Sequence, residues 1–198
     1  VYAMLNEAAP YLGFPLRMVL GNMWLFKGLL TKVLPMVSPM CNAFVKTTFC
    51  CTMAEGSQTP NVIPSEAYIV CNLRTSPHQN VEESLAVLKK YADKYDLEFE
   101  IIHARNASNT VDYKGEEFGY LKKCLNECYP DAGVIPYLMT GGTDCRHYEA
   151  VADNCLRFCP IKMSNEQLAA MHAANESIGV KEVADCVKFY KYYIKNHR

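Results

Sequence analysis

The chain has 198 residues, half of them hydrophobic, and a formal net charge of −1. This length suits one domain or two small ones with a hydrophobic core of ordinary size. The nearly balanced charge argues against a nucleic-acid-binding protein, which would need a basic surface. No apolar stretch reaches the roughly 20 residues that span a bilayer, because Asn22 and Lys27 interrupt the best one, residues 18–30.

Ten cysteines are many for this length, and their spacing bears on the compartment of the protein. No Cys-x-x-Cys pair occurs in the sequence, so a zinc knuckle is not expected. Cys124 and Cys128 are spaced to share one face of a helix. We therefore expect most cysteines to be small buried residues of a protein in the reducing cytoplasm. A secreted disulfide framework is the alternative, and it suits smaller chains with weaker cores.

Residues 1–45 contain little charge and many large apolar side chains. Pro15, Pro35 and Pro39 are expected to divide them into two or three short helices. The apolar residues around Trp24 predict a broad surface that covers a neighbouring domain.

Two alternating segments follow, residues 46–53 and 67–74, and each predicts a strand. A helix is predicted to begin after Asn80, because Glu83 completes a capping box. Residues 97–102 alternate again and predict a third strand. Together these elements predict a small α+β sandwich with an antiparallel sheet.

The order of elements changes beyond the polar segment 107–115, which we interpret as a linker. Helices and strands then alternate, as is typical of an α/β layer with a mostly parallel sheet. Ser164 and Gln167 predict a second capping box near the C-terminal end. The expected order is a helix at 116–128, a strand at 134–139, a helix, a strand at 155–159 and two final helices.

The turn after residues 134–139 can present backbone N–H groups to an anion, because two glycines and a helix start follow the expected strand. Gly142 and Thr143 are therefore candidates for binding a substrate carboxylate. Asp144 lies beside them, and its alternative role is to cap the helix that follows.

His172 is the strongest candidate for metal chemistry, since Asn175 and Glu176 follow closely and can orient an imidazole. Zinc needs three or four ligands, and the other histidines show no ligand spacing with His172. The chain alone is therefore not expected to supply a metal site.

Arg74 and Asn61 are the next pair of candidates. Arg74 ends an expected strand, where its fork of donors suits a carboxylate. Asn61 follows a turn and can add an amide donor. The alternative is an exposed arginine at a strand end and an asparagine in a loop.

The candidate residues lie in two sets of short motifs that follow one another along the chain. One set comprises Thr47-Thr48, Gly56, Asn61-Val-Ile-Pro64, Asn72-Leu-Arg74 and Pro77, and the other comprises residues 142–148, 157–160 and 172–176. The first set resembles the lid domain, and the second the catalytic domain, of the zinc-dependent aminoacylase/carboxypeptidase metallopeptidase family. The carboxypeptidase S branch is the most similar.

This resemblance implies two domains and an activity. Residues 1–108 would form the lid or dimerisation domain, incomplete at its start and with an N-terminal helical insertion. Residues 109–198 would form the C-terminal part of an α/β catalytic domain. Such enzymes use two zinc ions to activate water, which attacks the amide bond of a peptide or N-acyl amino acid beside a free carboxylate.

The resemblance also assigns roles to the candidate residues. His172 would be a metal ligand, with Asn175, Glu176 and Asp144 around it. The substrate would be held by Asn61, Arg74, Gly142 and Thr143.

The remaining family residues, including the glutamate that acts as general base, are expected upstream of Val1, so this chain would hold no catalytic residue. We expect it to be an inactive portion of a cytoplasmic hydrolase, with zinc unbound or incompletely held. The expected partners are the substrate and a second copy bound through the lid, not nucleic acid or a membrane. The alternatives are a stand-alone dimerisation or small-ligand-binding α+β module, and a redox or metal-handling protein that uses its cysteines.

Overall fold

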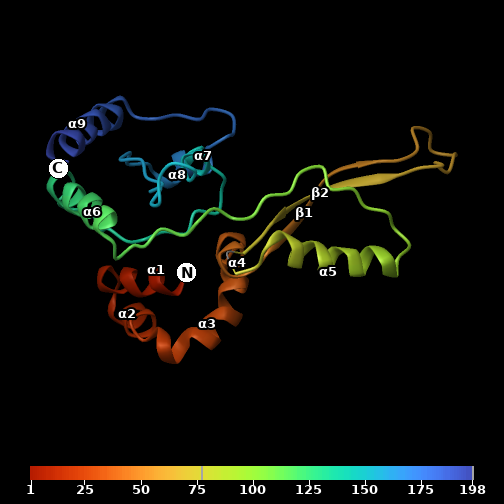
Figure 1. Cartoon of the computed structure of the whole chain (residues 1–198), viewed down its shortest axis with the longest axis horizontal. Helices are drawn as coiled ribbons and strands as arrows, with labels where there is room; N and C mark the ends of the chain where they lie inside the picture. Colours follow the sequence, from red (N-terminus) through yellow and green to blue (C-terminus); the bar gives the residue numbers. More distant parts are fainter. Residues whose placement is uncertain (77, 198) are drawn as a thin grey trace. The chain divides into compact units, whose positions relative to one another are not determined.

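The computed structural model describes residues 1–76 and 78–197. They form two compact units, Val1–Ser108 and Asn109–Arg198, which are drawn in Figure 1. The assignment of these units to a lid and a catalytic domain stays a prediction. None of the described helices combines the length and the apolar character that a membrane crossing requires.

Among the described residues, the first unit begins with four α-helices and one 3₁₀ helix, more than the two or three helices expected from its prolines. Proline occupies the first turn of three of these helices, where its missing N–H is not needed. Pro35, however, lies inside a helix and does not end it, so the helix continues to Val37. The helices are α1 (Tyr2–Ala8), the 3₁₀ helix η1 (Ala9–Tyr11), α2 (Phe14–Leu20), α3 (Met23–Val37) and α4 (Pro39–Val45).

A small core holds this helical group together. Ala9, Leu20 and Met23 are buried and in contact, with Leu30 packed against them. Ser38 begins α4 by accepting a hydrogen bond from the Cys41 backbone N–H at 3.1 Å. The short loops thus allow apolar residues of successive helices to pack in one core.

An antiparallel hairpin follows, made of β1 (Thr48–Glu55) and β2 (Tyr68–Arg74). Thr48 lies opposite Arg74 at one end of the ladder, and Glu55 opposite Tyr68 at the other. A bulge interrupts the register at Thr52. Both predicted strands are confirmed, although β1 begins and ends two residues later than the alternating pattern indicates.

Helix α5 (Val81–Lys94) comes next, and its predicted capping box is present. The Glu83 backbone N–H donates to Asn80 Oδ1 at 2.7 Å, and the Asn80 backbone N–H donates to Glu83 Oε2 at 3.1 Å. Thr47 fixes the approach to this helix, because its hydroxyl donates to Gln79 Oε1 at 2.5 Å and accepts from the Ser76 backbone N–H at 3.0 Å.

The strand predicted at residues 97–102 is not formed, which corrects the expected three-stranded sheet. Among the described residues the sheet has two strands. A strand requires a ladder of backbone hydrogen bonds to a neighbour. The one backbone bond at the start of this segment instead joins the Leu97 N–H to the Ala92 carbonyl at 2.9 Å, a helix-end contact. Alternation alone therefore misassigned the segment.

The second unit is organised around two helices that pack together, α6 (Glu116–Cys128) and α9 (Val180–Asn196). Their buried residues are Leu121, Cys124, Leu125 and Phe189. The aromatic rings of Tyr129, Phe158 and Tyr193 surround Phe189 with centroids 5.5–6.1 Å away. Two shorter helices, α7 (Cys145–Tyr148) and α8 (Asn165–Ala169), lie between them in sequence.

The parallel α/β layer predicted for this unit is absent from its described residues. Residues 134–139 and 155–159 are not strands, although Val134 and Leu156 pack against the α6–α9 core as their apolar character indicates. The capping box at Ser164 and Gln167 is confirmed. As a whole, the mixed α+β class with a small antiparallel sheet is confirmed, and the parallel sheet is not.

Candidate functional site

Arg74 is the last residue of β2 and is exposed. Its position opposite Thr48 is fixed by the hairpin ladder, and β1 is preceded by Thr47, which anchors the turn into α5. The arginine backbone is thus held between a strand pair and a capped helix. A guanidinium at such a place can offer paired donors to a planar carboxylate.

Asn61 lies in the loop that joins β1 to β2, and it too is exposed. This loop is shaped by local bonds, including one from the Ser57 hydroxyl to the Thr59 carbonyl at 2.8 Å. The ladder separates Asn61 from Arg74, because the loop follows the Glu55–Tyr68 end and Arg74 closes the other. Six strand residues span roughly 20 Å, so the hairpin does not bring the two side chains together.

Gly142, Thr143 and Asp144 form the approach to α7. The Thr143 hydroxyl oxygen is buried and lacks a hydrogen-bond partner among the described residues. Asp144 precedes the helix, but its side chain makes no capping bond, so its alternative role as a helix cap is not supported. At Gly142 an added Cβ would lie 3.4 Å from an Arg146 guanidinium nitrogen. The arginine therefore lies close above the glycine backbone.

His172 and Asn175 belong to the exposed loop between α8 and α9. Both have left-handed backbone, with φ of 64° and 62°, a region that His and Asn enter more readily than most residues. Glu176 accepts a hydrogen bond from the His172 backbone N–H at 3.1 Å. The carboxylate therefore fixes the main chain that carries the imidazole. Such backbone strain is common at functional sites.

The predicted site residues of the second unit lie in two separate segments of the chain. Within the part of this unit that the structure describes, no hydrogen bond or ion pair connects residues 142–144 with residues 172–176. The roles assigned to these residues therefore remain predictions that rest on their motifs.

Sequence reasoning gave no role to the pair of Arg157 and Glu149. Their side chains are mostly buried and joined by an ion pair at 2.8 Å. Arg157 also donates to the Cys155 carbonyl at 3.3 Å, and the Cys145 thiol points to the same oxygen at 3.3 Å. The pair thus ties α7 and the residues just after it to the segment around residue 157. Their opposite charges, eight residues apart, were the available signal.

The described residues do not fit a complete metal centre. No group of three or more His, Cys, Asp or Glu side chains converges among them, whereas zinc takes at least three protein ligands. His172 can supply one ligand only. No step of a reaction can be assigned to a metal held by these residues alone.

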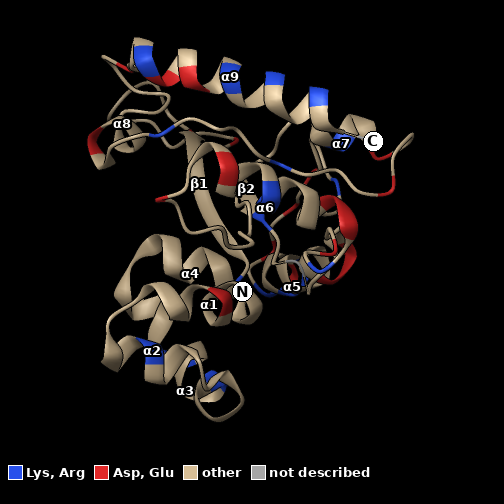
Figure 2. Ribbon diagram, turned by 90° about the vertical axis from the view of Figure 1, so that its left-hand side faces the viewer, with Lys and Arg blue, Asp and Glu red and all other residues tan. Residues whose placement is uncertain are grey.

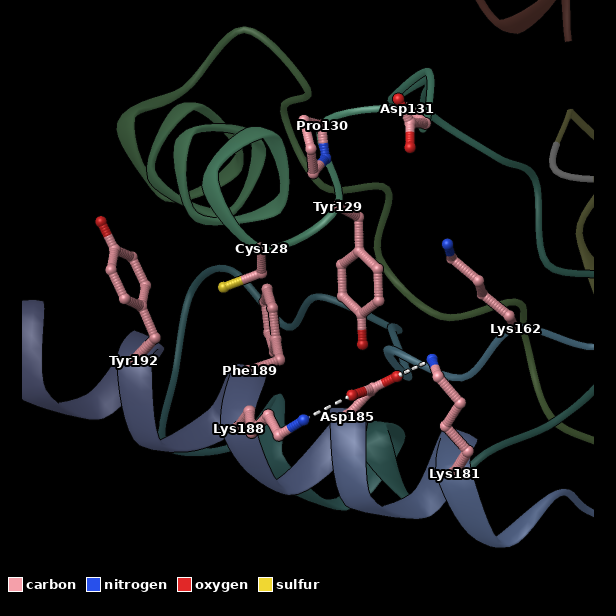
Figure 3. Close-up of a pocket in the computed structure, with 10 residues that line it drawn as sticks. All are labelled: Cys128, Tyr129, Pro130, Asp131, Lys162, Lys181, Asp185, Lys188, Phe189 and Tyr192. Atoms are coloured by element: carbon pink, nitrogen blue, oxygen red, sulfur yellow. Dashed lines mark hydrogen bonds and ion pairs between the residues drawn. The ribbon is translucent and has the colours of Figure 1, made fainter.

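A hollow of about 470 Å³ lies between the end of α6 and one side of α9, and Figure 3 shows its lining. Lys181 and Lys188 bind Asp185 at 2.7 and 2.9 Å, and Lys162 lies 5.4 Å from the centre of the Tyr129 ring. Burial raises the pKa of Tyr129, and the nearby Asp185 carboxylate adds to this. None of the predicted site residues lines this hollow.

Comparison with known proteins identifies the family to which the chain belongs. Residues 5–111 match the family model of the peptidase dimerisation domain. This match covers more than half of the chain, so the chain belongs to the M20 peptidase family. Within that family it falls in the carboxypeptidase S-like branch, and the resemblance seen in the motifs is confirmed.

Three relatives illustrate the range of the branch and its neighbours. N-fatty-acyl-amino acid synthase/hydrolase PM20D1.1 of Danio rerio is 30% identical over 196 residues, 98% of this chain and 38% of that protein. Probable carboxypeptidase S-like 2 of Dictyostelium discoideum is 30% identical over 186 residues, 92% of this chain and 35% of that protein. Succinyl-diaminopimelate desuccinylase of Nitrosomonas europaea is 26% identical over 142 residues, 71% of this chain and 36% of that protein.

The chain therefore spans little more than a third of the length of these relatives. No solved structure matches it significantly. Because the chain covers so small a part of these relatives, the activity and substrates of a complete enzyme are stated for it as proposals.

Proposed function

We propose that this chain is the lid and the C-terminal catalytic part of a metal-dependent hydrolase that cleaves an amide bond beside a free carboxylate. The substrate class is N-acyl amino acids or short peptides. The observation that carries the proposal is the match of nearly the whole chain to an N-fatty-acyl-amino acid synthase/hydrolase and to a carboxypeptidase S-like protein.

Arg74 is proposed to bind the substrate carboxylate. A carboxylate held by two parallel N–H donors is fixed in position as well as in charge. Arg74 is exposed at the end of β2, and the ladder to Thr48 fixes the arginine backbone. Asn61 is proposed to contact the same substrate, which requires its loop to move toward Arg74 when substrate binds.

The metal of the complete enzyme is proposed to be zinc, as a pair of ions. His172 is proposed to be one of the ligands, on a loop held by Glu176. Bound zinc would supply activation of a water molecule. The other ligands and the general base are proposed to come from outside the residues described here.

A second copy of the chain is the proposed macromolecular partner. An isolated two-stranded hairpin is marginally stable in water, and strand edges readily pair with another chain. Phe49, Met53 and Ile69 on the hairpin are exposed by half or more. Pairing of two hairpins would cover such side chains, as the name of the matched domain suggests.

The test uses the longest natural protein that contains this sequence, purified beside the 198-residue chain. Hydrolysis of an N-acyl amino acid and of its methyl ester is measured for wild type and Arg74→Ala. We expect roughly a 10- to 100-fold loss of kcat/KM on the free acid, because a charge-assisted bond is removed. The ester should change little, since it has no carboxylate to bind.

Arg105→Ala is the matched control, because Arg105 is an exposed arginine of the same unit outside the hairpin. It should keep activity on both substrates. Full activity of Arg74→Ala on the free acid would overturn the carboxylate role. Turnover by the 198-residue chain alone would overturn the wider proposal, because its site would then use other residues.

A further inference from the structure

Cys51 and Cys71 lie directly opposite each other on β1 and β2. Their sulfur atoms are 3.6 Å apart, with the Cys71 thiol directed at Cys51 Sγ. Neither sulfur is in a disulfide in this structure. Two thiols in contact across a ladder form a defined chemical group, one that the proposed hydrolase chemistry does not use.

The backbone geometry allows these sulfurs to bond. Directly opposed residues of an antiparallel pair have Cα atoms about 4.5–5.5 Å apart, inside the range of about 4.4–6.8 Å that disulfides span. Bond formation brings the sulfurs to about 2.05 Å, which side-chain rotation at the two cysteines can supply. The bulge at Thr52 comes directly after Cys51, and a bulge bends the strand and increases its local twist.

Oxidants can also reach the pair. Cys51 is exposed and Cys71 is partly exposed. Cys145 also lies near another cysteine, Cys155, but Cys155 is buried and the Cys145 thiol points to its carbonyl oxygen. The hairpin pair combines sulfur contact with access from solvent.

We propose that Cys51 and Cys71 form a reversible cross-strand disulfide in the presence of a small disulfide such as oxidised glutathione. The Cys51 thiolate attacks one glutathione sulfur, and the first glutathione leaves as a thiolate that takes up a proton. The Cys71 thiolate then attacks Cys51 Sγ and displaces the second glutathione. Two protein thiols are oxidised, one glutathione disulfide is reduced, and two reduced glutathiones are released.

The rate has a predicted pH dependence. Burial raises the pKa of the Cys71 thiol, and its contact with Cys51 adds to this. The thiols of Cys51 and Cys50 are the titratable groups that act on Cys71. Because only a thiolate attacks a disulfide, closure by Cys71 should accelerate as the pH rises from 7 to 9.

The test exposes the folded 198-residue chain to oxidised glutathione, blocks remaining thiols with an alkylating reagent and maps the peptides. Trypsin leaves residues 47–74 as one peptide that holds Cys50, Cys51 and Cys71, and cleavage after Glu55 and Glu66 separates the two strands. We expect residues 47–55 and 67–74 to stay linked until dithiothreitol is added. A sample oxidised in guanidinium shows what unfolded cysteines do without the hairpin.

Cys50 provides the control, because it is adjacent to Cys51, exposed, and opposite Asn72 rather than a cysteine. Cys50→Ser should keep the link, whereas Cys51→Ser and Cys71→Ser should lose it. Wild-type protein decides the question without any variant. Complete alkylation of all three thiols after oxidation of the folded chain would overturn the proposal, as would a link through Cys50.

Discussion

At the scale of single residues, the His172 loop shows how the backbone that carries a predicted metal ligand can be held by a side chain. A left-handed conformation at a residue other than glycine costs free energy and persists where the surroundings enforce it. Here the enforcing contact is the Glu176 carboxylate on the His172 N–H, together with the Ala173 N–H, which donates to the Ala170 carbonyl at 2.9 Å. The loop conformation therefore depends on a side chain that the motif places four residues away.

Replacing Glu176 tests this dependence. We expect Glu176→Ala to accelerate hydrogen exchange of the His172 amide by roughly 10-fold, because a hydrogen bond to a charged acceptor is lost at an exposed site. NMR-detected exchange measures it. The Leu168 amide is an internal control, since it donates to the Ser164 carbonyl at 3.0 Å and should not change. Equal exchange at His172 in both proteins would show that Glu176 does not hold the loop.

Asp185 gives a prediction for pH. Hydrogen bonds from Lys181 and then Lys188 lower its pKa to about 2, whereas an aspartate in an unfolded chain titrates near 3.9. A lowered pKa means that the ion pairs stabilise the fold above about pH 4, and that this contribution disappears as the pH falls through about 2. We expect Asp185→Asn to lower Tm slightly at pH 6 and not at pH 2.

Thermal unfolding followed by circular dichroism from pH 6 to 2 measures this difference. Lys191→Gln is the matched control, because Lys191 is a lysine of the same charged helix (Figure 2) outside both ion pairs. A gap between Asp185→Asn and wild type that stays constant with pH would contradict the assignment.

At the scale of elements, the capping box of α5 gives a prediction for the free energy of unfolding. Asn80→Ala removes the acceptor for the Glu83 N–H and should lower the free energy of unfolding by about 1 kcal/mol. Asn80→Asp keeps an acceptor and should cost less. Urea unfolding monitored by circular dichroism measures both variants. Equal loss in the two variants would mean that the cap bond is not the cause.

Phe189 tests the core between α6 and α9. It is 1% exposed and is surrounded by aromatic rings. Phe189→Ala should destabilise the second unit by about 3–5 kcal/mol, because the lost contacts leave a cavity. Val180→Ala, on the same helix but 88% exposed, should change stability little. Urea unfolding that gives equal midpoints for both variants would refute this account.

The elements that sequence predicted well are those with local causes. Capping boxes at Asn80 and Ser164 depend on residues three positions apart, and both are present. The strands at 134–139 and 155–159 were predicted from apolar character, but a strand also needs a neighbour that the pattern cannot name. Their apolar residues still reach the core, so burial was easier to predict than backbone pairing.

The candidate site likewise has features with local causes, which could be predicted, and features that depend on strand register, which could not. The motifs predict a role for the His172 loop, and the structure shows left-handed backbone at two of its residues, His172 and Asn175. The separation of Asn61 from Arg74 depends on the register of the hairpin, which no single motif encodes. The contact between Cys51 and Cys71 depends on the same register and was missed for the same reason.

At the scale of the whole molecule, the chain exposes more surface than its size predicts. Its accessible area is 15,392 Å². A compact protein of its mass would expose roughly 9,400 Å², and two separate domains of half that mass roughly 11,400 Å² together. The excess is therefore independent of how the two units are arranged. Many large apolar side chains are exposed on this surface, which marks surfaces that associate with something else.

Helix α3 carries a clear share of this surface. Its Met23 and Leu30 face the small core, while Leu25 and Leu29 on another face are each 59% exposed and Trp24 is 76% exposed. A helix that is apolar on more than one face is normally covered on each. Figure 2 shows few charged residues on α3 and α4. Electrostatic repulsion therefore does not prevent this surface from packing against another apolar surface.

We therefore expect the isolated chain to self-associate and to bind an apolar fluorescent dye, with α3 as a main site of both. Leu25→Lys with Leu29→Lys should reduce dye fluorescence and shift sedimentation from larger assemblies toward the proposed hairpin-paired dimer, because two charges cannot be buried without partners. The helix should persist, since lysine is a good helix former. Lys27→Gln with Lys32→Gln, on the same helix, is the control and should not reduce association. If the leucine variant associates as strongly as wild type, the exposed face of α3 is not the contact, and the hairpin edge becomes the surface to test next.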